Sequence, residues 1–180
     1  MTHQWLLENN VEFFHNGNEL IFLEHGTAKP FSEISLSMAE MLLEDLENHP
    51  EACKSLDTLG IHDPVERIMK FAECRYGAFN ETSDFTDKSH DVEIYNCGNR
   101  GNCIHEGKLC NNIVAKYGII TRCEIRIIQL VAAELTDKEI ADRLFNSPYT
   151  VNTHITNILG KIGCKNRVGI AMFAVRNNLI

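Results

Sequence analysis

The last 60 residues of the chain, from Thr121 to Ile180, contain four successive helix-start signals. In two of them a Thr precedes a Glu by three residues. This is a capping box, in which both side chains accept hydrogen bonds from backbone N–H groups at the helix start. A Ser or Asn at the N-cap, with Pro suited to the first helical position, gives the other two. The four starts are Thr121 with Glu124, Thr136 with Glu139, Ser147 with Pro148, and Asn166.

The apolar residues between these starts recur at helical spacing, which predicts one buried face on each helix. They are Ile127, Ile128, Val131 and Ala132 in the first helix, Ile140, Ala141 and Leu144 in the second, and Val151, Ile155, Ile158 and Ile162 in the third. The third helix spans about Pro148 to Ile162. Its opposite face carries Tyr149, Asn152, Thr153 and Thr156.

A tight link, Phe145-Asn146-Ser147, joins the second and third helices. Two helices joined in this way, the second with small polar side chains outward, form a helix-turn-helix that fits a major groove. Asn can pair with an adenine edge, and Thr can contact base edges or phosphates. The alternative is a solvated polar face on an ordinary helical subdomain.

A longer run of residues favours the DNA-binding interpretation. It is unbroken from Leu135 to Phe145 and continues with Ser147, Thr150, Val151, His154, Asn157, Ile158, Lys161, Ile162, Gly163, Asn166, Arg167, Ala174, Val175, Arg176, Leu179 and Ile180. With these residues the last third of the chain resembles the LuxR-type DNA-binding domain through all four helices.

The resemblance implies a transcription regulator that binds double-stranded promoter DNA, as a homodimer packed through the fourth helix. It places the third helix in the major groove, with Tyr149, Thr153 and Thr156 on the same face as the groove contacts. Those implied contacts are Thr150, Val151 and Asn152, and the implied contacts to phosphate, or supports for them, are His154, Lys161 and Arg167.

Three positions depart from the pattern of that family. Asn152 stands where a basic residue usually follows the Thr-Val pair, and Glu134 replaces the usual Gly before the second helix. Gly160 weakens the third helix by about 1 kcal/mol relative to Ala. The base preference of the family therefore does not transfer to this chain.

The charge is divided unevenly along the chain. Residues 116–180 hold nine Lys or Arg against five Asp or Glu, while residues 1–115 hold eight against twenty. Non-specific DNA affinity comes largely from the release of phosphate counterions. A modestly basic module on an acidic partner should therefore bind weakly as a monomer, and dimerisation would compensate.

Length and composition predict a two-domain cytoplasmic protein. A chain of 180 residues with 44% hydrophobic content can bury one medium core and one small one. No apolar run approaches the roughly 20 residues of a membrane span, and the N-terminus lacks signal-peptide features. The chain also lacks a phosphate-binding Gly-rich loop, a nucleophile elbow and a kinase signature, so we expect no enzyme activity.

Residues 1–95 predict an α+β sensor or dimerisation domain. Its hairpin signal is an Asn-Gly pair between two apolar runs. Apolar residues at helical spacing follow, and then a polar stretch that is predicted as a loop. The expected strands are 11–14 and 20–23, the expected helices are 37–48, 50–59 and 64–76, and the polar stretch is 77–93.

Three cysteines and a histidine lie within 14 residues of a glycine-rich segment. They are Cys97, Cys103, His105 and Cys110. With His105 or the more distant Cys74 as fourth ligand they could hold zinc, and Cys74 would suit an iron–sulfur cluster. The spacing lacks the close cysteine pairs of zinc fingers. A surface loop with incidental thiols is the alternative.

The sequence therefore predicts a mainly α protein. An α+β domain at 1–95 with a short hairpin is followed by a connecting loop at 96–118 and a four-helix helix-turn-helix domain at 119–180. The predicted function is sequence-specific DNA binding in transcription regulation. The alternative function is a metal- or redox-sensing interaction adaptor that keeps the helical fold and binds DNA weakly.

Overall fold

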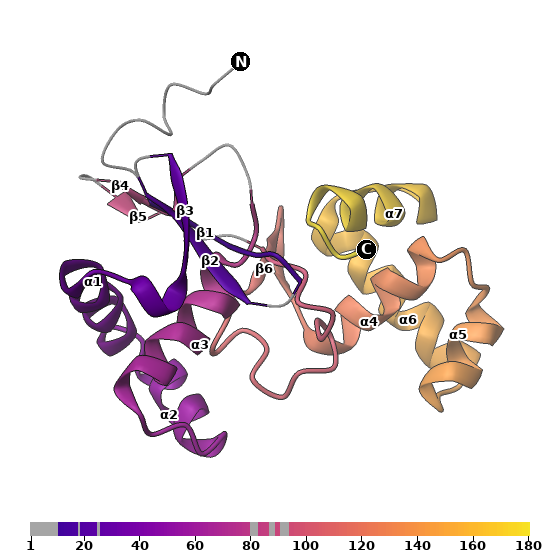
Figure 1. Ribbon diagram of the computed structural model, residues 1–180. Helices are drawn as coiled ribbons and strands as arrows, with labels where there is room; N and C mark the ends of the chain where they lie inside the picture. Colours follow the sequence, from indigo (N-terminus) through magenta and orange to yellow (C-terminus); the bar gives the residue numbers. More distant parts are fainter. Residues whose placement is uncertain (1–10, 18, 25, 80–82, 87–88, 91–93) are drawn as a thin grey trace. The chain divides into compact units, whose positions relative to one another are not determined.

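The computed structural model describes residues 11–17, 19–24, 26–79, 83–86, 89–90 and 94–180 (Figure 1). The chain divides into two compact units. Unit 1 comprises Met1–Tyr95 and Lys108–Asn111, and unit 2 comprises Asn96–Gly107 and Asn112–Ile180. The described residues form seven α-helices and two small antiparallel sheets, so the protein is mainly α. No helix in the described part of the chain is long and apolar enough to cross a membrane.

The sheet of unit 1 begins with the predicted hairpin. Strands β1 (Val11–His15) and β2 (Leu20–Glu24) pair antiparallel with Phe13 opposite Phe22, and β3 (Thr27–Pro30) pairs with β2 on the other side. The two strands expected around the Asn-Gly pair are confirmed. Asn18 of the predicted turn lies outside the described residues.

The polar stretch 77–93 is not only a loop, which corrects the prediction. It contains β4 (Phe85–Thr86) and β5 (Ser89–His90), and β4 pairs with β1 through Phe85 and Val11. The sheet thus has the order β3-β2-β1-β4-β5. Phe85 is buried, and a strand of two residues is too short to give a period-2 signal. Residues 80–82, 87–88 and 91–93 lie outside the described part.

Three helices of unit 1 confirm the helical predictions. The short helix η2 (Phe31–Glu33) leads to α1 (Leu36–Glu47), α2 (Pro50–Thr58) and α3 (Pro64–Tyr76). Asp63 caps α3 by accepting hydrogen bonds from two backbone N–H groups, and a Pro occupies the first position of α2 and of α3. α3 packs against both α1 and β1.

An aromatic cluster fills the core of unit 1. The Phe13 ring lies 6.0 to 6.4 Å from the rings of Phe22, Phe31, Tyr76 and Phe85. The Tyr76 hydroxyl donates a 2.6 Å hydrogen bond to Asp45, which satisfies its polar end. Burial raises the pKa of Tyr76 far above its usual range, and the carboxylate of Asp45 adds to this shift.

Unit 2 holds a small hairpin and four helices. The hairpin is β6 (Ile113–Ala115) with β7 (Gly118–Ile120), and the helices are α4 (Arg122–Ala132), α5 (Asp137–Leu144), α6 (Pro148–Ile162) and α7 (Arg167–Arg176). Both capping boxes and both polar N-caps that the sequence predicts are present. The hairpin was not predicted, because its link of Lys116 and Tyr117 carries no turn signal.

Part of the cysteine-bearing segment packs on α4. Gly101 has a left-handed backbone (φ +82°), and a Cβ built there would lie 2.7 Å from Arg126 Cγ. Arg100 is 1% exposed, and its Nη1 donates a 2.6 Å hydrogen bond to Glu106. The second oxygen of Glu106 accepts from the Gly101 N–H at 2.8 Å. A buried ion pair therefore fixes the loop where glycine permits close approach to the helix.

Candidate nucleic-acid interface

The link between α5 and α6 is three residues long. Phe145 follows the last residue of α5 as its C-cap, and its left-handed backbone (φ 53°) reverses the chain direction. Ser147 then caps α6 by accepting from the Thr150 N–H. The Phe145 side chain is 96% exposed. An exposed aromatic ring beside a helix start is a contact candidate that our sequence reasoning missed, although Phe145 belonged to the resembling string.

α6 has one buried face and one exposed polar face. Val151, Ile155 and Ile158 are buried, and the helix packs on α4, α5 and α7. The exposed side chains of the opposite face are uncharged and can form hydrogen bonds. This α6 polar face consists of Tyr149, Asn152, Thr153, Thr156 and Asn157.

Val151 does not belong to this surface, so its burial does not support the expected role as a groove contact. Its side chain is fully buried, so it fixes the helix to the core and reaches no groove. Thr150 is half-buried and its hydroxyl lies 2.8 Å from the Ser147 hydroxyl. The hydroxyls of Thr153 and Thr156 donate to backbone carbonyls four residues earlier. Their oxygens keep acceptor capacity.

Lys161 connects three elements of unit 2. Its Nζ donates to Glu124 Oε2 at 2.7 Å and to the Ile119 carbonyl at 2.9 Å, while its own carbonyl accepts from the Tyr117 N–H at 2.8 Å. Glu124 is buried and also caps α4. Because a buried carboxylate neutralises the ammonium, Lys161 orients the end of α6 and contributes little charge for phosphate.

Arg167 also makes bonds within unit 2. Its guanidinium donates to Asp137 at the start of α5 and to the Leu135 carbonyl. Arg167 therefore joins the beginnings of α5 and α7 and stabilises the packing of these two helices. Lys165, between the two engaged cations, is exposed, and among the residues that the structure describes no ion pair holds it. Lys165 is thus the better placed of the three for phosphate.

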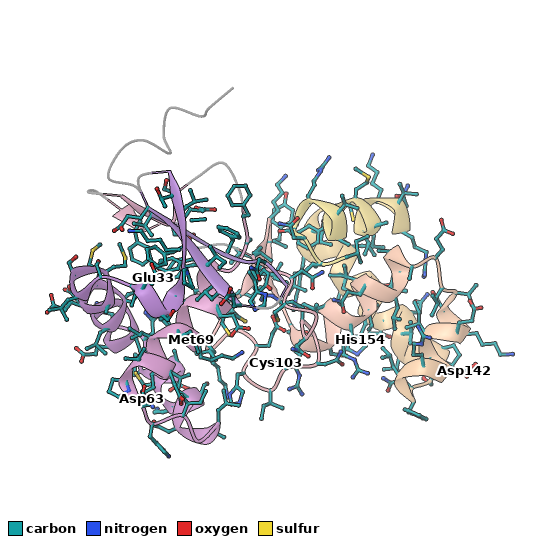
Figure 2. All side chains as sticks on the ribbon, in the orientation of Figure 1. Glu33, Asp63, Met69, Cys103, Asp142 and His154 are labelled. Carbon is teal, nitrogen blue, oxygen red and sulfur yellow. The ribbon has the colours of Figure 1, made fainter. Side chains whose placement is uncertain are left out.

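His154 lies on α6 beside α4, as Figure 2 indicates. Its Nε2 is 4.0 Å from Cys123 Sγ, and both side chains are half-buried. The thiol of Cys123 contacts the imidazole, so His154 is held against α4 at the edge of α6.

The Lys161–Glu124 contact predicts a pH dependence of stability. Burial alone raises the pKa of Glu124, but hydrogen bonds from Lys161 and Thr121 outweigh it and lower the pKa below 4.5. A lowered pKa stabilises the fold above the unfolded-state value, and the contribution is lost as pH falls through the lower folded-state value. The free energy of unfolding of the wild type, measured in urea, should therefore decrease below about pH 4.5.

The Lys161→Met variant provides the test. It should be less stable than wild type at neutral pH, and the difference should shrink as the pH falls, because Glu124 then protonates in both proteins. Glu139 has a lowered pKa in both proteins, since its side chain and Thr136 form the second capping box. It therefore cancels in the comparison. A difference that stays constant with pH would contradict the assigned contact.

The five predicted metal ligands are divided between the units. Cys97, Cys103 and His105 belong to unit 2, and Cys74 and Cys110 belong to unit 1. The seven cysteines form no disulfide among the described residues. Within the described ranges, no three side chains of His, Cys, Asp or Glu lie close enough together to hold a metal ion. The arrangement gives the predicted zinc or iron–sulfur site no support, and that site stays a prediction.

Comparison with known proteins identifies the C-terminal part of the chain. Residues 118–174 match the model of the luxR family of bacterial regulatory proteins. This stretch runs from β7 through α7 and includes the whole α6 polar face. Residues 118–174 form a LuxR-family domain. The resemblance seen in the sequence is thereby confirmed for this part of the chain.

Similar proteins share this LuxR-family domain. The chain is 44% identical over 61 residues to the transcriptional regulatory protein LiaR of Bacillus subtilis, which covers 34% of the chain and 29% of LiaR. It is 33% identical over 69 residues to the oxygen regulatory protein NreC of Staphylococcus aureus, which covers 38% of the chain and 32% of NreC. The matches thus span about a third of each protein.

Proposed function

We propose that the chain is a transcription regulator that binds promoter DNA through its LuxR-family domain. The observation that carries the proposal is the exposed α6 polar face within a domain of that family. The relatives that share the domain are named as regulatory proteins. In this proposal α5 and α6 act as a helix-turn-helix, and α6 enters the major groove.

The α6 polar face suits base recognition more than charge attraction. Asn152 and Asn157 each offer an amide N–H donor and a carbonyl acceptor. These can pair with the N7 acceptor and the N6 amino donor of an adenine edge. Thr153 and Thr156 present hydroxyl oxygens beside them. Affinity for phosphate then comes from cations around the face, such as Lys165, and His154 adds a contact at its edge.

The proposal assigns DNA binding to residues 119–180 and signal sensing or assembly to residues 1–95. Residues 96–118 connect these parts. Because Gly101 packs on α4, the connection is anchored to the DNA-binding side at one point. A signal that changed this loop would act directly on the helix beneath it.

We also propose that the chain binds DNA as a homodimer through α7. Val168, Met172 and Val175 recur at i, i+4 and i+7, so they form one stripe on the helix. Their exposed fractions are 69%, 46% and 55%. Ile170 and Ala174 on the other side are buried in the core of unit 2. An apolar stripe on a helix whose core contacts are already made suits a second copy of the same helix.

Selection of bound sites from randomised double-stranded DNA tests the proposed function with the full chain. A regulator should enrich one sequence, repeated as two half-sites about 10 base pairs or a multiple apart. Affinity for the enriched site should exceed that for unrelated DNA, and both should fall as salt rises. If no sequence were enriched, the chain would have only non-specific affinity for DNA, which would contradict the proposal.

The Asn152→Ala variant tests which residue reads a base. It should lose about 1 to 3 kcal/mol of discrimination at one base pair of each half-site, because the amide supplies both hydrogen bonds to the base edge. The measurement is competition binding against the four bases at each position.

Lys165→Ala is the contrasting variant. It should weaken binding to every sequence alike and reduce the slope of the salt dependence by about one, because a phosphate contact carries no sequence information. If Asn152→Ala also weakened binding uniformly, the orientation proposed for α6 would be wrong.

A further inference from the structure

A cavity of about 310 Å³ lies in unit 1, where the β1–β2 hairpin meets α3 and η2. This volume is at the small end of ligand-binding pockets. Its apolar lining is provided by Leu20, Phe31 and Met69, of which Met69 is labelled in Figure 2. Its polar lining includes His15, Glu19 and Glu73. The cavity belongs to the part of the chain that the LuxR-family domain does not cover.

The apolar wall of the cavity consists of two side chains buried in the core and one partly exposed, flexible side chain. Leu20 and Phe31 are 5% and 3% exposed, because both also belong to the core of unit 1. Met69 on α3 is 39% exposed, and its unbranched thioether can adjust to a ligand. A compact aromatic or aliphatic group would therefore replace water against this wall.

The polar wall of the cavity is acidic. Glu73 Oε2 accepts a hydrogen bond from Lys70 Nζ at 3.0 Å, which leaves its other oxygen available for a second donor. Glu19 is exposed at the rim. His15 Nδ1 accepts a hydrogen bond from the Gly17 N–H at 3.1 Å. Two carboxylates and one lysine leave an excess of negative charge.

We propose that this cavity binds a small organic cation, a primary amine with an apolar body. The apolar body would lie against Phe31 and Met69, and the ammonium would donate to Glu73 and Glu19. A bare metal ion fits less well. His15, Glu19 and Glu73 have suitable donor atoms, but in the described parts of the chain no three such side chains are close enough to share an ion.

The proposal gives unit 1 a ligand without requiring DNA binding, so the two proposals can fail separately. Titration calorimetry of the full chain with three probes of the same shape tests it: phenethylamine, phenethyl alcohol and phenylacetate. Phenethylamine should bind, the alcohol should bind about tenfold more weakly, and phenylacetate should give no heat of binding, because only the amine pairs with the carboxylates. Equal affinities for all three, or no saturable binding of the amine, would overturn the proposal.

Variants then locate the site. Glu73→Gln should weaken phenethylamine binding by about tenfold and leave the alcohol unchanged, since one charge-assisted hydrogen bond is lost. Glu19→Gln, at an exposed turn position that does not threaten folding, should act in the same direction. Met69→Trp should fill the cavity and abolish binding of both probes. Glu44→Gln, exposed on α1 away from the lining, is the matched control. Unchanged amine affinity in both Glu73→Gln and Glu19→Gln would place the amine elsewhere and overturn the assignment.

Discussion

Glutamates in place of Val168 and Met172 on α7 should lower affinity for the complete two-half-site operator by about 100-fold. The reason is that a dimer turns binding of the second half-site into an intramolecular event, which raises avidity by about 10² to 10⁴. Four glutamates facing one another across a two-fold axis would repel and would bury charge, so the dimer would separate. Sedimentation should show a dimer for wild type and a monomer for this variant.

The same variant should keep its fold and its affinity for a single half-site. Both side chains are exposed on α7, and the buried face of the helix is unchanged. Val65→Glu is the matched control, because it also replaces an exposed valine with a charge, at the start of α3 in unit 1. Loss of half-site binding would show that the stripe contacts DNA or the core. Unchanged binding to the full operator would show that α7 is not the dimer interface.

Removing Glu106 should cost unit 2 about 3 to 5 kcal/mol of unfolding free energy, because it leaves the buried guanidinium of Arg100 without its carboxylate. The two side chains are 1% and 7% exposed and 2.6 Å apart. Glu106→Ala can be followed in the full chain by hydrogen exchange of the α4 and α6 amides, which reports on unit 2 separately from unit 1.

The partner substitution distinguishes ion pairing from simple loss of packing. The double variant Arg100→Met with Glu106→Leu removes both charges and should recover most of the lost stability, since an apolar pair can replace a buried ion pair. Glu51→Gln, which breaks the exposed pair with Lys54, is the control and should leave exchange unchanged. A loss below about 1 kcal/mol in Glu106→Ala would show that this pair does not stabilise the fold of unit 2.

The helix boundaries of both units were predictable because their signals are local. Capping boxes at Thr121 and Thr136 need only neighbouring residues to form, and the structure contains both. The same holds for the Asn-Gly hairpin and for Pro64 at the start of α3. Among the missed elements, β4 with β5 and β6 with β7 are only two or three residues long. Strands this short leave no periodic signal in the sequence, although they pair with near neighbours.

The candidate site was predictable only in part. The sequence placed Asn152, Thr153 and Thr156 on one helix face, because helical periodicity alone determines that. It could not show that Val151 is buried beneath that face, or that Glu124 holds Lys161. Both facts depend on how α6 packs against α4 and the β6–β7 hairpin. A family resemblance does not reveal which charged side chains form ion pairs within the domain.

The sequence by itself determined the LuxR-family domain, its four helices and the polar character of its exposed α6 face. These follow from capping, from the period of 3.6 residues and from residue chemistry, which act over a few neighbours. Only the tertiary structure decided that Arg100 and Glu106 form a buried ion pair, and that His15, Met69 and Glu73 line one cavity. Burial and long-range pairing depend on which distant segments meet, and local signals do not carry that information.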